Sequence, residues 1–230
     1  MKTIGLIGGM SWESTATYYR LINEGIRRKC GGLHSAKILL YSVDFAEIEH
    51  MQSENRWDEA GERLGEAARK LDEAGADLLM ICTNTMHKVA DRIESYISIP
   101  LLHIADATGT RIGADGIRSV GLLGTRFTME EQFYRRVLEE KYNLQVSVPS
   151  TEDGAAVDSI IFNELCLGKI REESRLVYQR IVRSLAEDGC QAIILGCTEI
   201  SMLLSPQDTD IRLYDTTKIH ADQAVLHMLE

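Results

Sequence analysis

Short apolar runs alternate with longer stretches of helical period along this chain. The apolar runs predict strands at residues 3–7, 37–42, 77–82, 101–104, 119–123, 144–148 and 192–195. Between them, apolar residues recur every three or four positions, as at Ala60, Leu64, Ala67, Ala68 and Leu71. Apolar strands separated by helices are typical of a parallel sheet that is covered on both faces. The pattern therefore predicts an α/β fold.

The sequence repeats itself once. Residues 2–8 (KTIGLIG) resemble residues 118–124 (RSVGLLG), 116 positions later, with a basic residue, a hydroxyl and two glycines in register. Residues 73–84 (EAGADLLMICTN) align with residues 187–198 (EDGCQAIILGCT), 114 positions later. Two similar elements at nearly equal spacing indicate two half-size lobes of common origin. We expect an N-terminal lobe over 1–112, against which 213–230 packs, and a C-terminal lobe over 113–212.

The repeat places Thr83 and Cys197 at equivalent positions. Each follows an apolar strand and precedes a predicted helix, and open parallel sheets bind ligands at such places. If the two lobes face each other about a pseudo-two-fold axis, both side chains point into one cleft from opposite sides. Two acid/base groups that flank one carbon can remove a proton from one face and deliver a proton to the other, which is the chemistry of racemisation. Backbone N–H groups at the helix starts favour binding of a substrate carboxylate.

Composition narrows the possible partners. Twenty-five basic residues stand against 35 acidic ones, a formal net charge of -10, which is unfavourable for gripping nucleic acid or an anionic membrane surface. No window approaches the roughly eighteen apolar residues of a membrane-spanning helix, and the start does not resemble a secretory signal, so we expect a cytoplasmic protein. The five cysteines are scattered without a C-x-x-C pair, which argues against disulfides and against a metal site.

The glycines near the start invite a dinucleotide interpretation, but Gly5, Gly8 and Gly9 form G-x-x-G-G rather than G-x-G-x-x-G. Asp44 also follows too late for the acid that binds a ribose. We expect a turn that lets the substrate approach closely, with Met10 at its tip, and no cofactor. Two segments rich in small and polar residues, 11–17 and 150–157, are expected to be loops that close over the cleft.

The residues around both strand ends resemble those of a known family. The motifs LLMICTNTMH (78–87) and IILGCTEI (193–200) resemble the paired signatures of the cofactor-independent aspartate/glutamate racemases. The segments GGMSWEST (8–15) and GTRFTM (124–129) resemble the aspartate racemase branch. The resemblance implies two Rossmann-like lobes with the active site between them, commonly in a homodimer. It also implies that two cysteines, one from each lobe, exchange the α-proton of an amino acid without pyridoxal phosphate, metal or nucleotide.

The same resemblance implies how the substrate is bound. Asn84, Thr85 and Thr198 resemble the residues that bind its α-carboxylate, although short polar residues at helix starts also occur without a ligand. The distal part of the substrate is expected to contact a set of three residues, namely Gln52, Thr125 and Glu164. A solvent-exposed polar side chain is the alternative for Gln52.

The sequence departs from the family pattern at one catalytic position. Thr83 stands where the family has a cysteine, and the neighbouring Cys82 cannot simply replace it because adjacent strand residues point to opposite faces. A hydroxyl is a far poorer base than a thiol. We therefore expect Cys197 to handle the proton on one face and Thr83, directly or through a water, to handle the other poorly. His87 is expected to form a supporting hydrogen bond, and Glu199 either orients Cys197 or caps its helix.

Taken together, these features predict a racemase of a small amino acid, with acidic amino acids as the leading substrates. No lysine or arginine is placed by motif for a side-chain carboxylate, so other polar amino acids remain open. One alternative is a related isomerase, hydantoin racemase or decarboxylase that uses a single thiol. Another is a protein that binds amino-acid carboxylates and has lost turnover because of Thr83.

Overall fold

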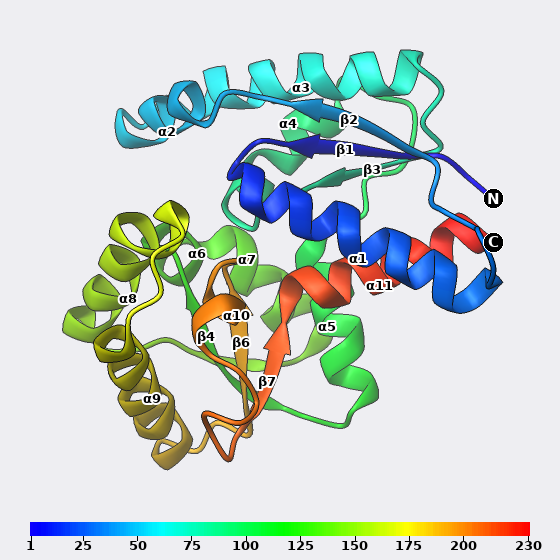
Figure 1. Cartoon of the computed structure of the whole chain (residues 1–230). Coiled ribbons are helices and arrows are strands. Elements are labelled where there is room, and N and C mark those ends of the chain that lie inside the picture. The colour runs from blue at the N-terminus through cyan, green and yellow to red at the C-terminus, as the bar shows by residue number, and fades with distance from the viewer. The chain divides into compact units, whose positions relative to one another are not determined.

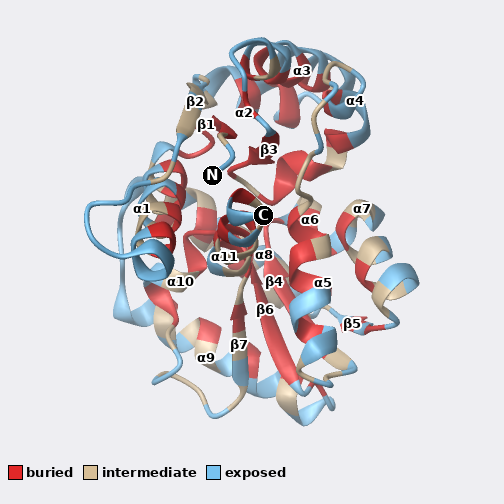
Figure 2. Ribbon diagram, turned by 90° about the vertical axis from the view of Figure 1, so that its right-hand side faces the viewer, coloured by how far each residue is buried: buried red, intermediate tan, exposed pale blue.

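The chain divides into two compact units, each of which is a parallel sheet flanked by helices (Figure 1). The computed structural model describes residues 1–230. The first unit contains Met1–Ile104 and His220–Glu230, and the second contains Ala105–Ile219. Buried residues concentrate on the strands and on the helix faces that cover them (Figure 2). None of the helices combines the length and the apolar composition that crossing a membrane requires.

The first unit is built on a three-stranded sheet with the order β2-β1-β3. Its central strand β1 and its strand β3 are buried throughout, whereas β2 lies at the edge and is partly exposed. Helices α1 and α11 pack closely because Gly25 has no side chain: a Cβ there would lie 2.6 Å from Val225 Cγ2. The elements are β1 (Ile4–Gly8), α1 (Trp12–Cys30), β2 (Ile38–Ser42), α2 (Phe45–Ser53), α3 (Trp57–Glu73), β3 (Leu78–Ile81), η1 (Thr85–Val89), α4 (Ala90–Glu94) and the end of α11 (Thr216–Leu229).

The second unit is built on a four-stranded sheet with the order β5-β4-β6-β7. Residues of α8 and α9 pack with the buried side chains of β4 and β6 to form its core, which includes Tyr178, Ile193 and Leu195. The elements are α5 (Ile104–Ala114), β4 (Ser119–Gly124), α6 (Arg126–Glu130), α7 (Gln132–Arg136), the π-helix η2 (Val137–Lys141), β5 (Gln145–Ser147), α8 (Thr151–Asn163), η3 (Leu165–Leu167), α9 (Glu172–Glu187), β6 (Ala192–Gly196), α10 (Ile200–Leu203) and β7 (Arg212–Asp215).

The internal repeat of the sequence is a repeat of strand pairing. In the first unit Ile4 of β1 pairs with Leu78 of β3, and in the second Val120 of β4 pairs with Ala192 of β6. These are the positions that the two sequence offsets of 116 and 114 relate to each other. The order β2-β1-β3 also matches β5-β4-β6. Thr83 and Cys197 therefore occupy equivalent places, each shortly after the strand on the same side of its central strand.

Three local expectations were wrong. Residues 101–104 form one bridge, between Leu101 and Leu79, because only Leu101–His103 lie between Pro100 and the start of α5. The segments 11–17 and 150–157 are helical from Trp12 and Thr151 onward. Ser11 and Ser150 cap these helices by accepting hydrogen bonds from the backbone N–H three residues later, which is why small polar residues cluster there.

Candidate active site

The turn between β1 and α1 packs tightly against its own unit. Gly9 has a φ of 96°, and its N–H donates to Thr15 Oγ1 at 2.8 Å. A Cβ on Gly9 would collide with the carbonyl oxygen of Val43. The glycine is therefore required by the close approach of the chain to itself. Met10 follows directly and is buried.

β3 ends beside this turn, because Ile7 of β1 and Ile81 of β3 are paired. Cys82 is fully buried: its N–H donates to the Ile7 carbonyl at 2.9 Å, and its carbonyl accepts from Ser14 Oγ at 2.8 Å. Burial raises the pKa of the Cys82 thiol, so this cysteine stays protonated at neutral pH. Thr83 is partly exposed. The structure thus keeps Cys82 in the core and leaves the accessible position to Thr83.

His87 holds the backbone of Thr83. Its Nδ1 lies 2.9 Å from the Thr83 carbonyl oxygen, and its Nε2 lies 3.2 Å from the N–H of Ile104. A carbonyl only accepts and an amide N–H only donates, so Nδ1 carries the proton and the ring is neutral. Burial, followed by the charges of His103 and His220, lowers the pKa of His87 well below its usual value. The imidazole therefore hydrogen-bonds to the backbone carbonyl of Thr83. His87 does not serve as a base for the Thr83 hydroxyl.

A second buried histidine, His220, lies close to His87. Its Nε2 lies 2.8 Å from the Leu102 carbonyl oxygen, so Nε2 donates and Nδ1 accepts from the Tyr18 hydroxyl at 2.9 Å. The ring centroids of His87 and His220 are 5.8 Å apart. Burial lowers the pKa of His220 to about 3. Sequence reasoning missed this network because Tyr18 and His220 lie 202 positions apart and neither belongs to a local motif.

The predicted carboxylate and distal-group ligands of the first unit lie around η1. Asn84 and Thr85 are buried at its start. Gln52 of α2 is only 5% exposed and donates from Nε2 to Met86 Sδ at 2.9 Å, so the solvent-exposed alternative for this residue was wrong. Because η1 is a short 3-10 helix of 5 residues, an anion here would depend on individual N–H and hydroxyl donors more than on a helix dipole.

Cys197 directly follows β6 in the second unit and is hydrogen-bonded to a carboxylate. It is 9% exposed, and its Sγ donates to Glu199 Oε2 at 3.0 Å. Glu199 is 5% exposed, and its side chain makes no capping bond to α10. Burial first, and then the Glu199 carboxylate, raise the pKa of Cys197 well above its usual value. At neutral pH Cys197 is therefore a thiol whose proton points at an acceptor.

Two further predicted residues lie beside Cys197. Gly124 of β4 and Gly196 of β6 are paired. The residues that follow them, Thr125 and Cys197, are therefore neighbours at the carboxyl ends of these two strands. A Cβ on Gly124 would lie only 2.9 Å from the Gly196 carbonyl oxygen, which is why both strands end in glycine. Thr125 caps α6 through its hydroxyl, and Thr198 is buried after Cys197.

Glu164, at the end of α8, is held by its own neighbours. Its Oε2 accepts from Ser174 Oγ at 2.6 Å, and its Oε1 lies 3.5 Å from Arg171 Nη1. The pKa of Tyr178 is raised by burial first and then by the charges of Cys197 and, more weakly, of Glu164. Cys197, Tyr178 and Leu165, the residue after Glu164, belong to one core cluster of the second unit.

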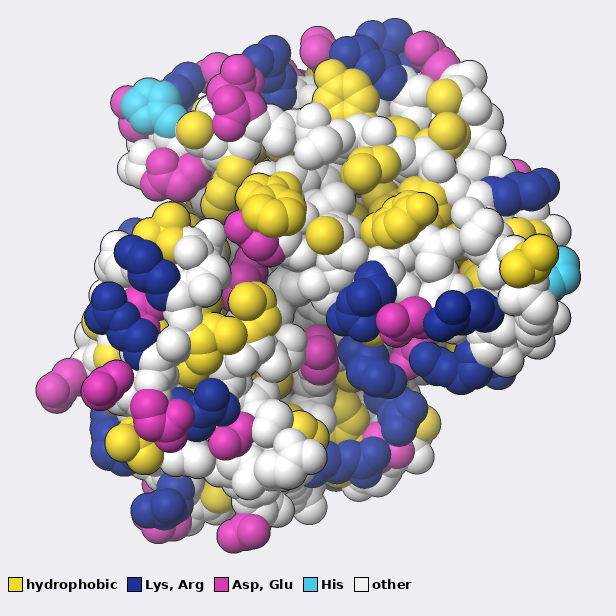
Figure 3. Space-filling model, in the orientation of Figure 1, with side chains coloured by type: hydrophobic (Ala, Val, Ile, Leu, Met, Phe, Trp, Pro, Cys, Tyr) yellow, Lys and Arg dark blue, Asp and Glu magenta, His cyan; other side chains and the backbone are white.

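Each unit thus gathers part of the predicted residue set. In the first unit they are Met10, Gln52, Thr83, Asn84, Thr85 and His87, and in the second they are Thr125, Glu164, Cys197, Thr198 and Glu199. No group of three or more histidine, cysteine, aspartate or glutamate side chains is arranged to hold a metal ion. The surface face drawn in Figure 3 carries basic and acidic side chains in mixture, together with exposed apolar side chains.

Residues 7–224 match the family of Asp/Glu/hydantoin racemases. The chain belongs to this family. Over its full length it is 53% identical to a putative Asp/Glu racemase from Yersinia pestis, with a TM-score of 0.94 and complete coverage of both chains. An aspartate racemase homologue from Pyrococcus horikoshii is 34% identical, with a TM-score of 0.87 and the same coverage. The broad specificity amino-acid racemase RacX of Bacillus subtilis is 25% identical over 96% of each chain.

Membership of the Asp/Glu/hydantoin racemase family confirms the resemblance found in the sequence motifs. The fold is confirmed as well. The glutamate racemase of Francisella tularensis, 18% identical, matches 99% of this chain with a TM-score of 0.66, so even distant racemases share the two-lobed α/β architecture.

Proposed function

We propose that this protein interconverts the enantiomers of acidic and other polar amino acids by two-base proton transfer without a cofactor. Cys197 acts on one face of the α-carbon and Thr83 on the other. The equivalence of these two residues after β3 and β6, in the same strand register, carries the proposal. The proposal includes that the ends of β3 and β6 face a single substrate molecule. Family membership and the racemases among the relatives support the reaction class.

Cys197 supplies the better of the two proton-transfer groups. In the resting protein it is a thiol, and it can deliver its proton to a carbanion-like intermediate. To act as a base it first passes its proton to the Glu199 carboxylate, whose oxygen lies 3.0 Å from Sγ. The thiolate then takes the α-proton from the substrate. Because burial opposes the thiolate, forming it is an uphill step, and we expect slow turnover.

Thr83 supplies the weaker group. Its hydroxyl donates a proton far more readily than it removes one from carbon, and His87 is committed to its carbonyl. Cys197 therefore removes protons more easily than Thr83 does. Two enantiomers have equal free energies, so kcat/KM has to be the same in both directions. The asymmetry between the two groups should instead appear as unequal kcat and unequal KM values.

The substrate range follows from the distal ligands. We assign the α-carboxylate to Asn84, Thr85 and Thr198, and the distal group to Gln52, Thr125 and Glu164. Glu164 is an acid, and its neighbour Arg171 is more than half exposed. A site of this composition offers an amide, a hydroxyl and a carboxylate, so it should accept polar side chains besides those of aspartate and glutamate.

Incubation in deuterated water tests the reaction. Each enantiomer of aspartate, glutamate and several neutral polar amino acids is followed by NMR for α-deuterium and by chiral chromatography for inversion. Inversion with deuterium uptake supports the two-base reaction. Exchange without inversion would indicate a single active thiol, and the same assay with 5-substituted hydantoins would then identify the alternative substrate. Binding without exchange would exclude turnover altogether.

The absence of a cofactor and the homodimer are part of the same proposal. Activity should persist after exhaustive dialysis against a chelator and after treatment with a carbonyl reagent that removes pyridoxal phosphate. Sedimentation equilibrium measures the assembly state. A monomer with full activity would contradict the dimer while leaving the reaction untouched.

A further inference from the structure

The helix that follows Cys197 depends on contacts with the rest of its unit, among them the burial of Ile200 and Leu203 in the core. α10 is a single turn of 4 residues, and one isolated turn is unstable because helix nucleation is unfavourable. Backbone hydrogen bonds nevertheless continue from the Cys197 turn into it. The N–H of Ile200 donates to the Cys197 carbonyl at 3.2 Å, and that of Met202 donates to the Glu199 carbonyl at 3.0 Å. A shift of α10 would therefore move both Cys197 and Glu199.

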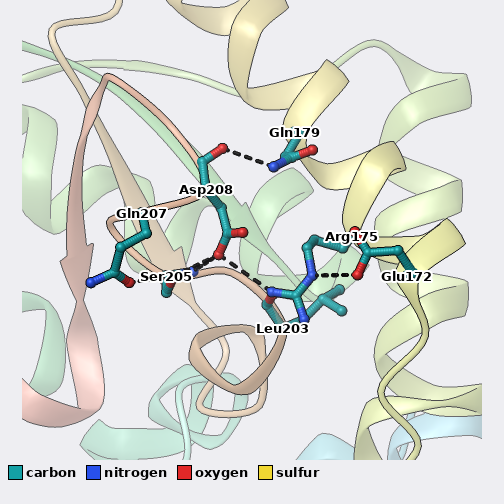
Figure 4. Close-up of polar contacts among 7 residues, drawn as sticks. All are labelled: Glu172, Arg175, Gln179, Leu203, Ser205, Gln207 and Asp208. Atoms are coloured by element: carbon teal, nitrogen blue, oxygen red, sulfur yellow. Dashed lines mark hydrogen bonds and ion pairs between the residues drawn. The ribbon is translucent and has the colours of Figure 1, made fainter.

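Arg175 of α9 binds the end of α10 (Figure 4). Its Nη1 donates to the Leu203 carbonyl at 2.5 Å and lies 3.3 Å from Asp208 Oδ2, while its Nε lies 3.0 Å from Glu172 Oε2. The Arg175 side chain is 25% exposed, so these bonds are partly shielded from water. A guanidinium carries five N–H donors in fixed directions, so it can hold a carbonyl and two carboxylates in one defined arrangement, whereas the three donors of a lysine sit on a single, freely rotating nitrogen.

Asp208 fixes the chain that leaves α10. Its carboxylate accepts from the Ser205 N–H at 2.7 Å and from Ser205 Oγ at 2.6 Å. Its backbone carbonyl accepts from Gln179 Nε2 at 3.0 Å (Figure 4). The hydrogen bonds from Ser205, and then the charge of Arg175, lower the pKa of Asp208, so it is ionised at neutral pH. Residues 204–211 are thereby tied to α9 through a side chain and through the backbone.

We propose that Arg175, itself oriented by Asp208, is the positioning residue that keeps the Glu199 carboxylate against Cys197 Sγ. Arg175 contacts neither Cys197 nor Glu199 and acts on them only through α10. The inference rests on the proposed function for the meaning of the Cys197–Glu199 pair. The geometry itself has a readout that needs no turnover, because the reactivity of a thiol reports its thiolate fraction.

Alkylation of Cys197 by iodoacetamide measures that geometry. The rate is determined on the full chain over a range of pH, with modification at Cys197 assigned by fragment mass spectrometry. In Arg175→Met the carboxylate loses its fixed place, so the thiolate forms at lower pH. We expect the alkylation rate at neutral pH to rise about tenfold, the effect of one pKa unit. We expect kcat to fall about tenfold with KM nearly unchanged, because the substrate ligands stay in place.

The double variant with Glu199→Gln decides whether Arg175 acts through Glu199. If it does, Arg175→Met has no further effect on Cys197 alkylation once Glu199 has lost its charge. Arg180→Met is the matched control, because Arg180 lies on the same helix and pairs with Asp153, so both readouts should stay at wild-type values. Arg175→Lys keeps the charge without the three-way bridge and should show an intermediate shift, which keeps the test open if Arg175→Met does not fold.

Two results would overturn the proposal. One is an alkylation profile that both Arg175→Met and Arg175→Lys leave unchanged. The other is a shift of the alkylation profile that is equally large with and without the Glu199 carboxylate. Arg175 would then affect Cys197 by stabilising the fold in general and not through Glu199. A wild-type protein that racemises nothing would overturn the proposed function instead, and it would leave the alkylation result standing.

Discussion

Mild acid should destabilise the first unit, because two of its buried histidines have to stay neutral. His87 and His220 each use one ring nitrogen as a donor and the other as an acceptor, so the folded state has no place for a second proton. In the unfolded chain both bind a proton near the ordinary pKa of 6.5, whereas folded His220 does so only at about 3. Below pH 6.5 the unfolded state therefore holds more protons, and stability is lost as the pH falls towards 3.

The size of the effect follows from the pKa shift. A shift of one unit corresponds to about 1.4 kcal/mol, so the His220 shift alone amounts to about 5 kcal/mol once the pH reaches its folded pKa. His87 shifts in the same direction for the same reason, which is burial. His220, titrating only in the unfolded state over this range, should alone cost the first unit about 1.7 kcal/mol between pH 6.5 and pH 5, and His87 adds to the loss in the same direction. Against the roughly 5–15 kcal/mol that stabilises a typical domain, a loss of this size is measurable.

Urea denaturation followed by tryptophan fluorescence isolates this unit, since both tryptophans of the chain, Trp12 and Trp57, belong to it. The free energy of unfolding is measured from pH 7 to pH 5. His220→Gln keeps a donor and an acceptor but cannot titrate, so it should remove about 1.7 kcal/mol of the loss. His34→Gln removes an exposed histidine and should not change it. Equal stability at pH 7 and pH 5, or an unchanged loss in His220→Gln, would refute the reasoning.

Three other changes test the site and its frame. Thr83→Cys should raise kcat/KM about tenfold or more, because a thiol is the better base; polarimetry on both enantiomers measures it, and no gain contradicts the role of Thr83. Cys197→Ser should lower kcat/KM by about 10²–10⁴ in the same assay, and retention of most activity excludes proton transfer by Cys197. Gly9→Ala should cost about 1–3 kcal/mol in urea denaturation, owing to its φ of 96° and the collision with Val43. Gly75→Ala, with a φ of 91° but open space, should cost less, and equal losses would remove the collision from the explanation.

The sheets could be predicted where strands are buried on both faces. β1, β3 and β6 contain only apolar residues and glycine, and β4 adds one serine at its start, so composition alone reveals them. β7 was missed because its 4 residues, RLYD, begin and end with a charged residue and contain no longer apolar run. The edge strand β2 was predicted because its sequence ILLYS contains an apolar run, which β7 lacks.

The candidate site could be predicted where its residues are neighbours in sequence. The segments that follow β3 and β6 each carry several polar residues in a row, and their equivalence was visible from the repeat. The residues that hold these segments come from elsewhere: His220 bonds Tyr18 at a separation of 202 positions, and Arg175 bonds Leu203 at 28. Such contacts depend on how helices pack, and no local pattern of residue types encodes them.

The equivalent strand registers of the two units also explain why Cys82 cannot replace the cysteine that is missing at position 83. In the alignment that relates Thr83 to Cys197, Cys82 corresponds to Gly196. A Cβ on Gly196 would lie 2.9 Å from the Leu123 carbonyl oxygen, so this position is one where the chain packs against itself. Cys82 sits at the same point of the first unit, fully buried and with its pKa raised by burial. A thiol there faces the core and cannot reach a substrate. In the proposed reaction the difference between the two faces of the α-carbon is set by the side chain at position 83, so Cys82→Ala should alter stability while leaving the ratio of the two kcat values unchanged.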